Sequence, residues 1–270
     1  MRPPIFDTIF LDVGSTLLEL TASWEKVYQQ VFQRAGYPLE LGEVEQAVSY
    51  SWGIVSQEDP TAFFENTREG SLHWQREIEQ RVMARLNIHP DIQEELFWQL
   101  VQVFEDPQAY YLYPETVPTL ASLKEAGYRL GIISNWSWHL PALLEFHGLA
   151  QYFDQVITSA RIGCSKPNPA IFQAALDQMQ ADPAKSLHIG DTWRADVLGA
   201  WSLGIGALWL DRRDEATRFG ALSDLQKRIR IEKLDQIWPF LETNVVRPPD
   251  THAQTLLTSS ELNMKEQGQL

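Results

Sequence analysis

Short apolar runs alternate with amphipathic segments over the second half of the chain. The apolar runs predict strands at 129–134 (RLGIIS), 155–158, 186–189 and 205–210 (IGALWL), with helices at about 115–126, 140–147, 169–179 and 195–203. A similar run at 5–11, bounded by two prolines and by Asp12-Val13-Gly14, predicts a first strand near the N-terminus. Continuous apolar strands alternating with helices are typical of a parallel sheet covered on both faces.

A different rhythm fills the chain between residues 22 and 104. Apolar residues recur there at helical spacing in four sets, separated by turn-forming segments such as Glu58-Asp59-Pro60 and His89-Pro90-Asp91. The pattern predicts an α/β fold: a Rossmann-like parallel sheet core (1–16 and 113–244) with an inserted α-helical domain (17–112). The Pro-, Thr-, Gln- and Ser-rich tail, 245–270, has no such periodicity and is expected to be disordered.

Composition and charge narrow the possible partners. The chain has 270 residues, 44% of them hydrophobic, and a formal net charge of −14, so it can bury a sizeable core and is poorly suited to bind nucleic acid or an anionic membrane surface. The single cysteine, Cys164, excludes an intrachain disulfide and a cysteine metal cluster. We find no signal peptide and no apolar run that could span a membrane, and we expect a cytoplasmic protein.

Polar residues stand where the predicted strands end. Asp12, Gly14 and Thr16 follow the first strand, Ser134-Asn135 ends the second, and Gly190-Asp191 ends a later one. Lys166 follows the third strand, and Asp196 lies five residues after Asp191. Ligands of open parallel sheets bind at the carboxyl ends of the strands. Crowded carboxylates repel unless a cation lies among them, and oxygen ligands suit Mg²⁺.

Four of these segments resemble the motifs of the haloacid dehalogenase superfamily, in its phosphatase-like branch with a helical cap inserted after the first motif. They are FLDVGST (10–16), ISN (133–135), SKPNPAIF (165–172) and HIGDTWRAD (188–196), and they occur in the family's order. The resemblance extends over roughly 6–241. It implies a hydrolase that uses Mg²⁺ to cleave a small phosphorylated substrate.

The resemblance also implies a role for each matching residue. Asp12 would be the nucleophile that forms an aspartyl-phosphate, and Lys166 would neutralise the charge around it. Thr16, Ser134, the amide of Asn135 and Lys166 would bind phosphate. Mg²⁺ would be held by Asp12, the backbone carbonyl of Gly14, Asp191 and Asp196, with Asp196 in direct contact or one shell further out.

One position departs from the family pattern. Family phosphatases carry a second aspartate two residues after the nucleophile as general acid/base, and this chain has Gly14 there. The loss of a general acid typically costs ~10²–10⁴-fold in rate. We therefore expect poor hydrolysis of alkyl phosphates, a smaller loss for aryl or acyl phosphates, and no phosphomutase chemistry. Ser15 and Glu19 are polar neighbours that could replace the acid, and the sequence does not decide between them.

Alternative functions follow from the same departure. The chain could be a catalytically weakened or inactive phosphate- or partner-binding protein. It could also be a dehalogenase-like hydrolase, or a phosphonatase-like one using Lys26, which is the only lysine of the predicted cap. Trp136, Trp138 and Trp193 flank the motifs and could form an aromatic rim for a ring-bearing substrate, although packing between core and cap is the commoner role of such residues.

Overall fold

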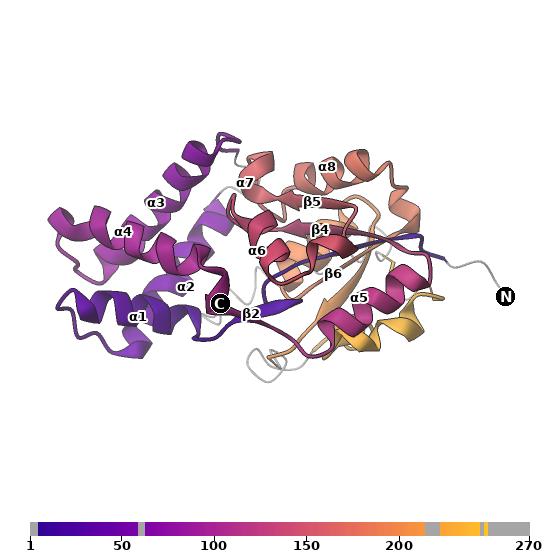
Figure 1. Ribbon diagram of the computed structural model, residues 1–270, viewed down its shortest axis with the longest axis horizontal. Helices are drawn as coiled ribbons and strands as arrows, with labels where there is room; N and C mark the ends of the chain where they lie inside the picture. Colours follow the sequence, from indigo (N-terminus) through magenta and orange to yellow (C-terminus); the bar gives the residue numbers. More distant parts are fainter. Residues whose placement is uncertain (1–4, 59–62, 214–221, 244–245, 248–270) are drawn as a thin grey trace.

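A parallel sheet of six strands forms the centre of the molecule (Figure 1). The computed structural model describes residues 5–58, 63–213, 222–243 and 246–247. The strand order is β5-β4-β1-β6-β7-β8, and every neighbouring pair is parallel. The strands are β1 (Thr8–Leu11), β4 (Arg129–Ser134), β5 (Gln155–Thr158), β6 (Ser186–Gly190), β7 (Gly206–Leu210) and β8 (Arg230–Ile231). The predicted α/β class is confirmed.

Strand β1 is fully buried between β4 and β6. In the sheet register Leu11 pairs with Ile132 on one side and with Ile189 on the other, so the three strands end at the same edge. From β1 the chain continues to β4 and β5 on one side and then crosses to β6 and β7 on the other. This reversal is a topological switch point, where open α/β sheets form their ligand sites.

Helices connect the strands of the sheet. They are α5 (Thr116–Glu125), α6 (Leu140–Phe146), α7 (Ser159–Ile162), α8 (Pro169–Met179), α9 (Gly199–Trp201) and α11 (Asp224–Ile229). The helix predicted at 195–203 is wound differently: its first part is a π-helix, η4 (Trp193–Leu198), that leads into α9. Single π turns are frequent at functional sites, and this one carries the buried Asp196.

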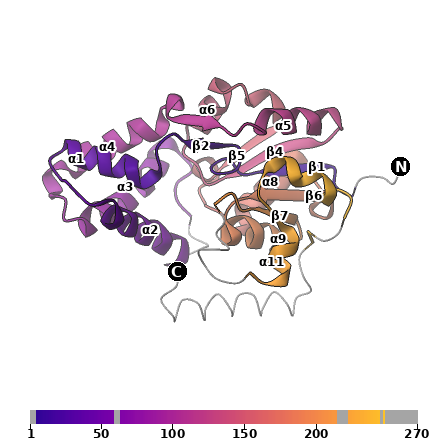
Figure 2. The same ribbon diagram turned by 90° about the horizontal axis from the view of Figure 1, so that it is seen from below.

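Four helices lie together beyond one end of the sheet (Figures 1 and 2). They are α1 (Trp24–Arg34), α2 (Leu41–Glu58), α3 (Arg68–Arg85) and α4 (Pro90–Glu105). Side-chain caps begin α1 and α3, where Ser23 and Thr67 accept hydrogen bonds from backbone amides of the first turn. The chain enters the block through β2 (Leu18–Leu20) and leaves it through β3 (Tyr110–Leu112), which pair antiparallel.

The helical block also touches the core through a loop. The backbone amide of Phe64, ahead of α3, donates to the carbonyl of Gly163 at 2.7 Å. Gly163 ends α7 with a φ of 83°, and a β-carbon there would overlap the Phe64 carbonyl, so both the backbone angle and the close approach require glycine. The block is therefore joined to the core by this contact as well as by the strand pair.

Two residues of the C-terminal tail lie against the core. Of the tail expected to be disordered, only Val246 and Arg247 fall within the described residues, and 248–270 lie outside them. Val246 is buried, and its carbonyl accepts from the Ala207 amide and the Trp201 indole. None of the described helices is long and apolar enough to cross a bilayer.

A buried carboxyl lies inside the helical block. Glu79 of α3 is fully buried, and the Tyr28 hydroxyl of α1 donates to its Oε1 at 2.8 Å. Burial raises the pKa of Glu79 from 4.5 to about 7, although hydrogen bonds from Tyr28 and Gln75 act in the opposite direction. The folded protein thus binds this proton more tightly than the unfolded chain does.

We expect this group to make stability fall as the pH rises. Between pH 4.5 and 7 the wild type should lose up to about 3 kcal/mol of unfolding free energy relative to Glu79→Gln, because the folded-state pKa is the higher one. Urea unfolding at pH 4.5, 6 and 8 measures the difference. The exposed Glu77→Gln is the matched control. The same difference at all three pH values would show that folding does not raise the pKa of Glu79.

Candidate active site

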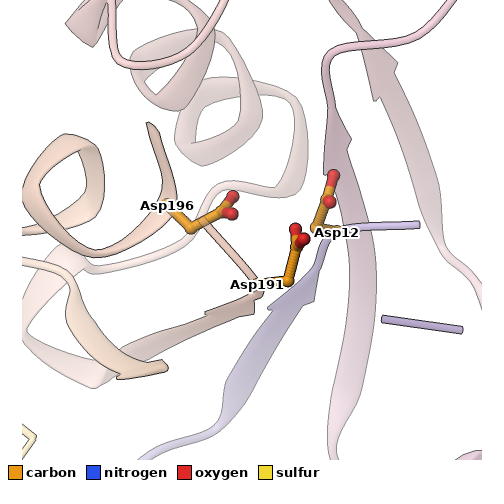
Figure 3. Close-up of side chains that lie close together, drawn as sticks. All are labelled: Asp12, Asp191 and Asp196. Atoms are coloured by element: carbon orange, nitrogen blue, oxygen red, sulfur yellow. The ribbon is translucent and has the colours of Figure 1, made fainter. Parts of the chain in front are cut away.

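The candidate site lies at the carboxyl edge of the central strands. Asp12 follows β1, Asp191 follows β6, and Asp196 comes from η4, and one oxygen from each lies within 4.8 Å of the others. Figure 3 shows the three carboxylates gathered beyond these strand ends. The sheet register brings Asp12 and Asp191 together, because β1 and β6 are neighbours that end at one level.

Lys166 is the cation of this cluster and is almost completely buried. Its Nζ donates to Asp12 Oδ1 at 2.8 Å, to Asp196 Oδ1 at 2.5 Å and to the Ile133 carbonyl at 2.9 Å. Burial alone would lower the pKa of Lys166, but the two carboxylates raise it above its ordinary value. The ammonium group stays charged and uses all three of its donors inside the site.

Asp196 positions Lys166 from behind. Burial would raise the pKa of Asp196, but Lys166 and His188 hold it well below its usual range. Its Oδ1 also lies 2.9 Å from Nε2 of the buried His188, and its Oδ2 accepts from the Thr192 amide. A β-carbon at Gly190 would overlap this carboxyl group, so the chain needs glycine there. The oxygens of Asp196 are therefore already engaged by protein donors.

For Asp191, the charges of Lys166 and Arg213 offset the effect of burial only in part. Burial, followed by the negative charges of Asp12 and Asp196, raises the pKa of Asp191 well above its usual value. Burial also raises the pKa of Asp12, against the effect of Lys166. Within the part of the chain that the structure describes, the only cation paired with Asp12 is Lys166, and Asp191 has no ion pair. A hard divalent cation beside Asp12 and Asp191 would fit this donor set and remove the repulsion.

The predicted phosphate-binding residues have different surroundings. Ser134, at the end of β4, is buried, and it lowers the pKa of the Asp12 carboxyl. The side chain of Asn135 is used differently: its Nδ2 donates to the Lys166 carbonyl at 3.0 Å, and its Oδ1 accepts from the Lys166 amide at 2.7 Å. Asn135 thus fixes the backbone of Lys166. The Thr16 hydroxyl is buried and has no partner among the described residues.

Gly14 lies against an aromatic ring. A β-carbon built at Gly14 would come within 3.2 Å of Cζ3 of Trp136, closer than ordinary contact. Trp136 is half-buried, and its ring lies 5.6 Å from the ring of Tyr110. The space beside position 14 is therefore bounded by an indole ring.

The other two tryptophans singled out in the sequence have different surroundings. Trp193 packs edge-on against Trp201 and Trp209 within the core, which is the packing role weighed above. The ring of Trp138 lies under the Arg161 guanidinium at 4.8 Å. Cys164 is buried, and burial raises the pKa of its thiol to about 11, as expected for an inert small residue.

Two arginines next to the site escaped the sequence reasoning. Arg212 donates to the carbonyls of Ser15 and Thr16 and to Glu115, which ties the loop after β1 to the start of α5. Arg213 donates to the Ser15 hydroxyl and to Glu19, and its charge lowers the pKa of Asp191. Both follow β7 directly, so the same strand-end search could have found them.

Ser15 and Glu19, the two polar neighbours of the nucleophile, contact each other. Ser15 has a left-handed φ of 52°, which is costly for a residue other than glycine, and its hydroxyl donates to Glu19 Oε2 at 2.9 Å. The Tyr113 hydroxyl donates to the same oxygen at 3.1 Å. Glu19 is thus engaged by Ser15, Tyr113 and Arg213.

The comparisons with known proteins agree with this architecture. Haloacid dehalogenase-like hydrolase domain-containing protein 3 of Danio rerio is 28% identical over 215 residues, 79% of this chain and 88% of that protein. The phosphoglycolate phosphatase of Vibrio vulnificus is 31% identical over 132 residues, 46% of this chain and 58% of that protein. The HAD-hydrolase YfnB of Bacillus subtilis, solved bound to magnesium, has the same fold, with a TM-score of 0.65 at 20% identity over 88% of this chain and 99% of that one.

A sequence profile of haloacid dehalogenase-like hydrolases matches residues 6–204, which include all four motifs. This match extends over more than half of the chain and confirms the resemblance found in the sequence. The chain belongs to the haloacid dehalogenase-like hydrolase family.

Proposed function

We propose that this hydrolase is a Mg²⁺-dependent phosphatase that transfers the phosphoryl group of a small substrate to Asp12 and then to water. The observation that carries the proposal is the charge arrangement at the strand ends. Lys166 contacts Asp12 and Asp196, while Asp191 lies beside Asp12 and forms no ion pair among the described residues. Such a site suits a divalent ion and a phosphoryl group together.

The Asp12 carboxylate, the Gly14 carbonyl and the Asp191 carboxylate would hold the ion. Asp196 would complete the acidic cluster as a positioning residue, because its oxygens accept from Lys166, His188 and Thr192. When bound, Mg²⁺ would neutralise phosphoryl oxygens and orient the group for in-line attack.

The chemistry then rests on residues of this chain. An oxygen of Asp12 attacks phosphorus, the bond to the leaving oxygen breaks, and the leaving group takes the electron pair. Lys166, Ser134 and the backbone amide of Asn135 would stabilise the charge on the phosphoryl oxygens. Water then attacks phosphorus and gives up a proton to the solvent, the bond to Asp12 breaks with its electron pair returning to the carboxylate, and phosphate leaves. Since position 14 has no carboxyl, the leaving group departs without a proton from that residue.

The helical block from 17 to 112 would act as a cap over this site. It is joined to the core by β2, β3 and the Phe64–Gly163 contact. Closure of such a cap excludes water and completes the site. A small phosphorylated substrate is consistent with this arrangement and with the phosphatase names of relatives such as the Vibrio protein.

Metal removal is the direct test of this function. Hydrolysis of p-nitrophenyl phosphate should fall to background in EDTA and return with Mg²⁺. In Asp191→Asn the Mg²⁺ concentration for half-maximal rate should rise by about 10–100-fold, because one anionic ligand is lost. Asp177→Asn, on the exposed face of α8, is the matched control and should match the wild type.

The alternative functions each predict a different experimental result. Folded protein that binds Mg²⁺ and phosphate but turns over no phosphate ester would contradict the proposal and favour a binding protein. Release of halide from a 2-haloacid would favour a dehalogenase. Borohydride trapping of a phosphonoaldehyde on Lys26, which is exposed on α1, would favour phosphonate cleavage.

A further inference from the structure

Trp136 stands close to where a general acid at position 14 would begin. The first atom of any side chain at Gly14 would already lie 3.2 Å from the indole, and a carboxyl group extends further from the backbone. An aspartate there would need the ring to move. The absence of a side chain at position 14 therefore matches the position of the Trp136 ring.

Trp136 has contacts through its backbone carbonyl and through its ring. The Trp136 carbonyl accepts from the Ala160 amide at 3.3 Å and from the Ser159 hydroxyl at 3.2 Å. The ring lies against Tyr110, which is buried and donates its hydroxyl to the Phe104 carbonyl. The backbone of Trp136 is therefore held by the core, and its ring, which forms a wall beside Gly14, packs beside Tyr110 of β3.

This wall is close to the nucleophile. Gly14 is two residues beyond Asp12, and Trp136 is two residues beyond Ser134, the last residue of β4, which neighbours β1 in the sheet. A β-carbon at position 14 would lie 3.2 Å from Cζ3 of the indole. Family phosphatases carry the general acid for the leaving group at position 14. This chain has an aromatic ring beside that position and no carboxyl group there.

We propose that Gly14 and Trp136 together select phosphate monoesters of planar aromatic alcohols. This inference rests on the proposed phosphatase function and names its substrate class. A phenolate has a conjugate acid pKa of about 10, well below that of an alkoxide, so it leaves phosphorus with its electron pair and needs no proton. The same ring can stack on the indole. Alkyl esters, such as the phosphoglycolate of the Vibrio relative's name, would gain neither advantage.

The test compares aryl and alkyl substrates in matched variants. For the wild type, kcat/KM should be on the order of 10²-fold or more higher for phenyl phosphate than for phosphoglycolate, because only the alkoxide needs an acid. Trp136→Ala should lower kcat/KM for phenyl phosphate roughly ten-fold and that for phosphoglycolate by a smaller factor, so that the aryl preference shrinks. Trp136→Phe should keep the aryl preference, and Trp138→Ala, whose ring packs under Arg161, should match the wild type.

The pair Gly14 and Trp136 should also be coupled. Gly14→Asp alone should gain little on phosphoglycolate, because the indole occupies the space of the carboxyl. Gly14→Asp combined with Trp136→Ala should gain on the order of 10²-fold over Trp136→Ala alone. Equal gains in the two backgrounds would overturn the steric part of the inference.

Binding measurements separate this inference from the phosphatase function. With Mg²⁺, calorimetry should show tighter binding of phenylphosphonate than of methylphosphonate, and Trp136→Ala should remove the difference. If no phosphate ester is hydrolysed, the phosphatase proposal fails, and this binding preference still decides whether the wall selects aromatic groups. If aryl and alkyl esters are hydrolysed equally well and both phosphonates bind equally, the inference is overturned while the phosphatase stands.

Discussion

Lys166→Met is expected to lower the unfolding free energy by about 3–5 kcal/mol, because it leaves buried carboxylates without their cation. Methionine keeps most of the length of lysine and removes the charge and all three donors. Asp12 and Asp196, which contact the ammonium at 2.8 and 2.5 Å, would then face each other across an apolar gap. Urea unfolding in EDTA measures the loss without a metal ion that could replace the charge.

The matched control for this variant is Lys185→Met. Lys185 is exposed just before β6, and the change should alter stability by less than about 0.5 kcal/mol. In Mg²⁺, kcat of Lys166→Met on p-nitrophenyl phosphate should also fall on the order of 10²-fold or more. A variant as stable as the wild type would contradict the view that Lys166 compensates the buried acidic cluster.

Asp12→Asn is expected to reduce kcat on p-nitrophenyl phosphate on the order of 10⁴-fold or more, as the loss of a covalent nucleophile does elsewhere. Its stability should stay within about 1 kcal/mol of the wild type, because the amide oxygen can still accept from Lys166. Burial raises the pKa of Asp12, so the neutral amide also relieves desolvation. The activity loss would thus report chemistry and not unfolding.

The control for this loss is Asp7→Asn. Asp7 lies just before the opposite end of β1 and pairs with Arg129 on a partly exposed surface, so its removal should leave kcat unchanged. An Asp12→Asn protein that keeps a tenth or more of the wild-type rate would remove Asp12 from the nucleophile's role.

Much of the core was accessible from the sequence because its strands are fully buried. β4 and β5 lie at the predicted residues, since continuous apolar runs between turn signals mark buried parallel strands. β2, β3 and β8 were not predicted. They have two or three residues each, and Leu18 pairs with Leu112 across almost a hundred residues. No local period can indicate so short and so distant a pairing.

The candidate site shows the same division. Strand-end reasoning and the family motifs named Asp12, Lys166 and Asp191, because each follows a strand that reaches one edge of the sheet. The sequence did not give Trp136 a position, because its ring reaches Gly14 across more than a hundred residues. It also left open how Asp196 acts. Only the folded geometry shows that its oxygens are used by Lys166, His188 and Thr192.

The departure at Gly14 now has a structural context. The first motif keeps the nucleophile and the backbone carbonyl of position 14, and an indole ring bounds the space in which a second carboxyl would lie. In the proposed mechanism, such a site can still make and break the bond between Asp12 and phosphorus. Its rate depends on how readily the leaving group departs as an anion.

In the proposed mechanism a phosphoryl group is bound covalently to Asp12 during turnover. Acid quenching during turnover would trap this intermediate. Wild-type protein hydrolysing p-nitrophenyl phosphate with Mg²⁺ should be quenched, digested and analysed by mass spectrometry. We expect one phosphoryl group, on the peptide that contains Asp12, and none in Asp12→Asn. Hydrolysis at full rate with no phosphoryl group on that peptide, or with one on another residue, would contradict it.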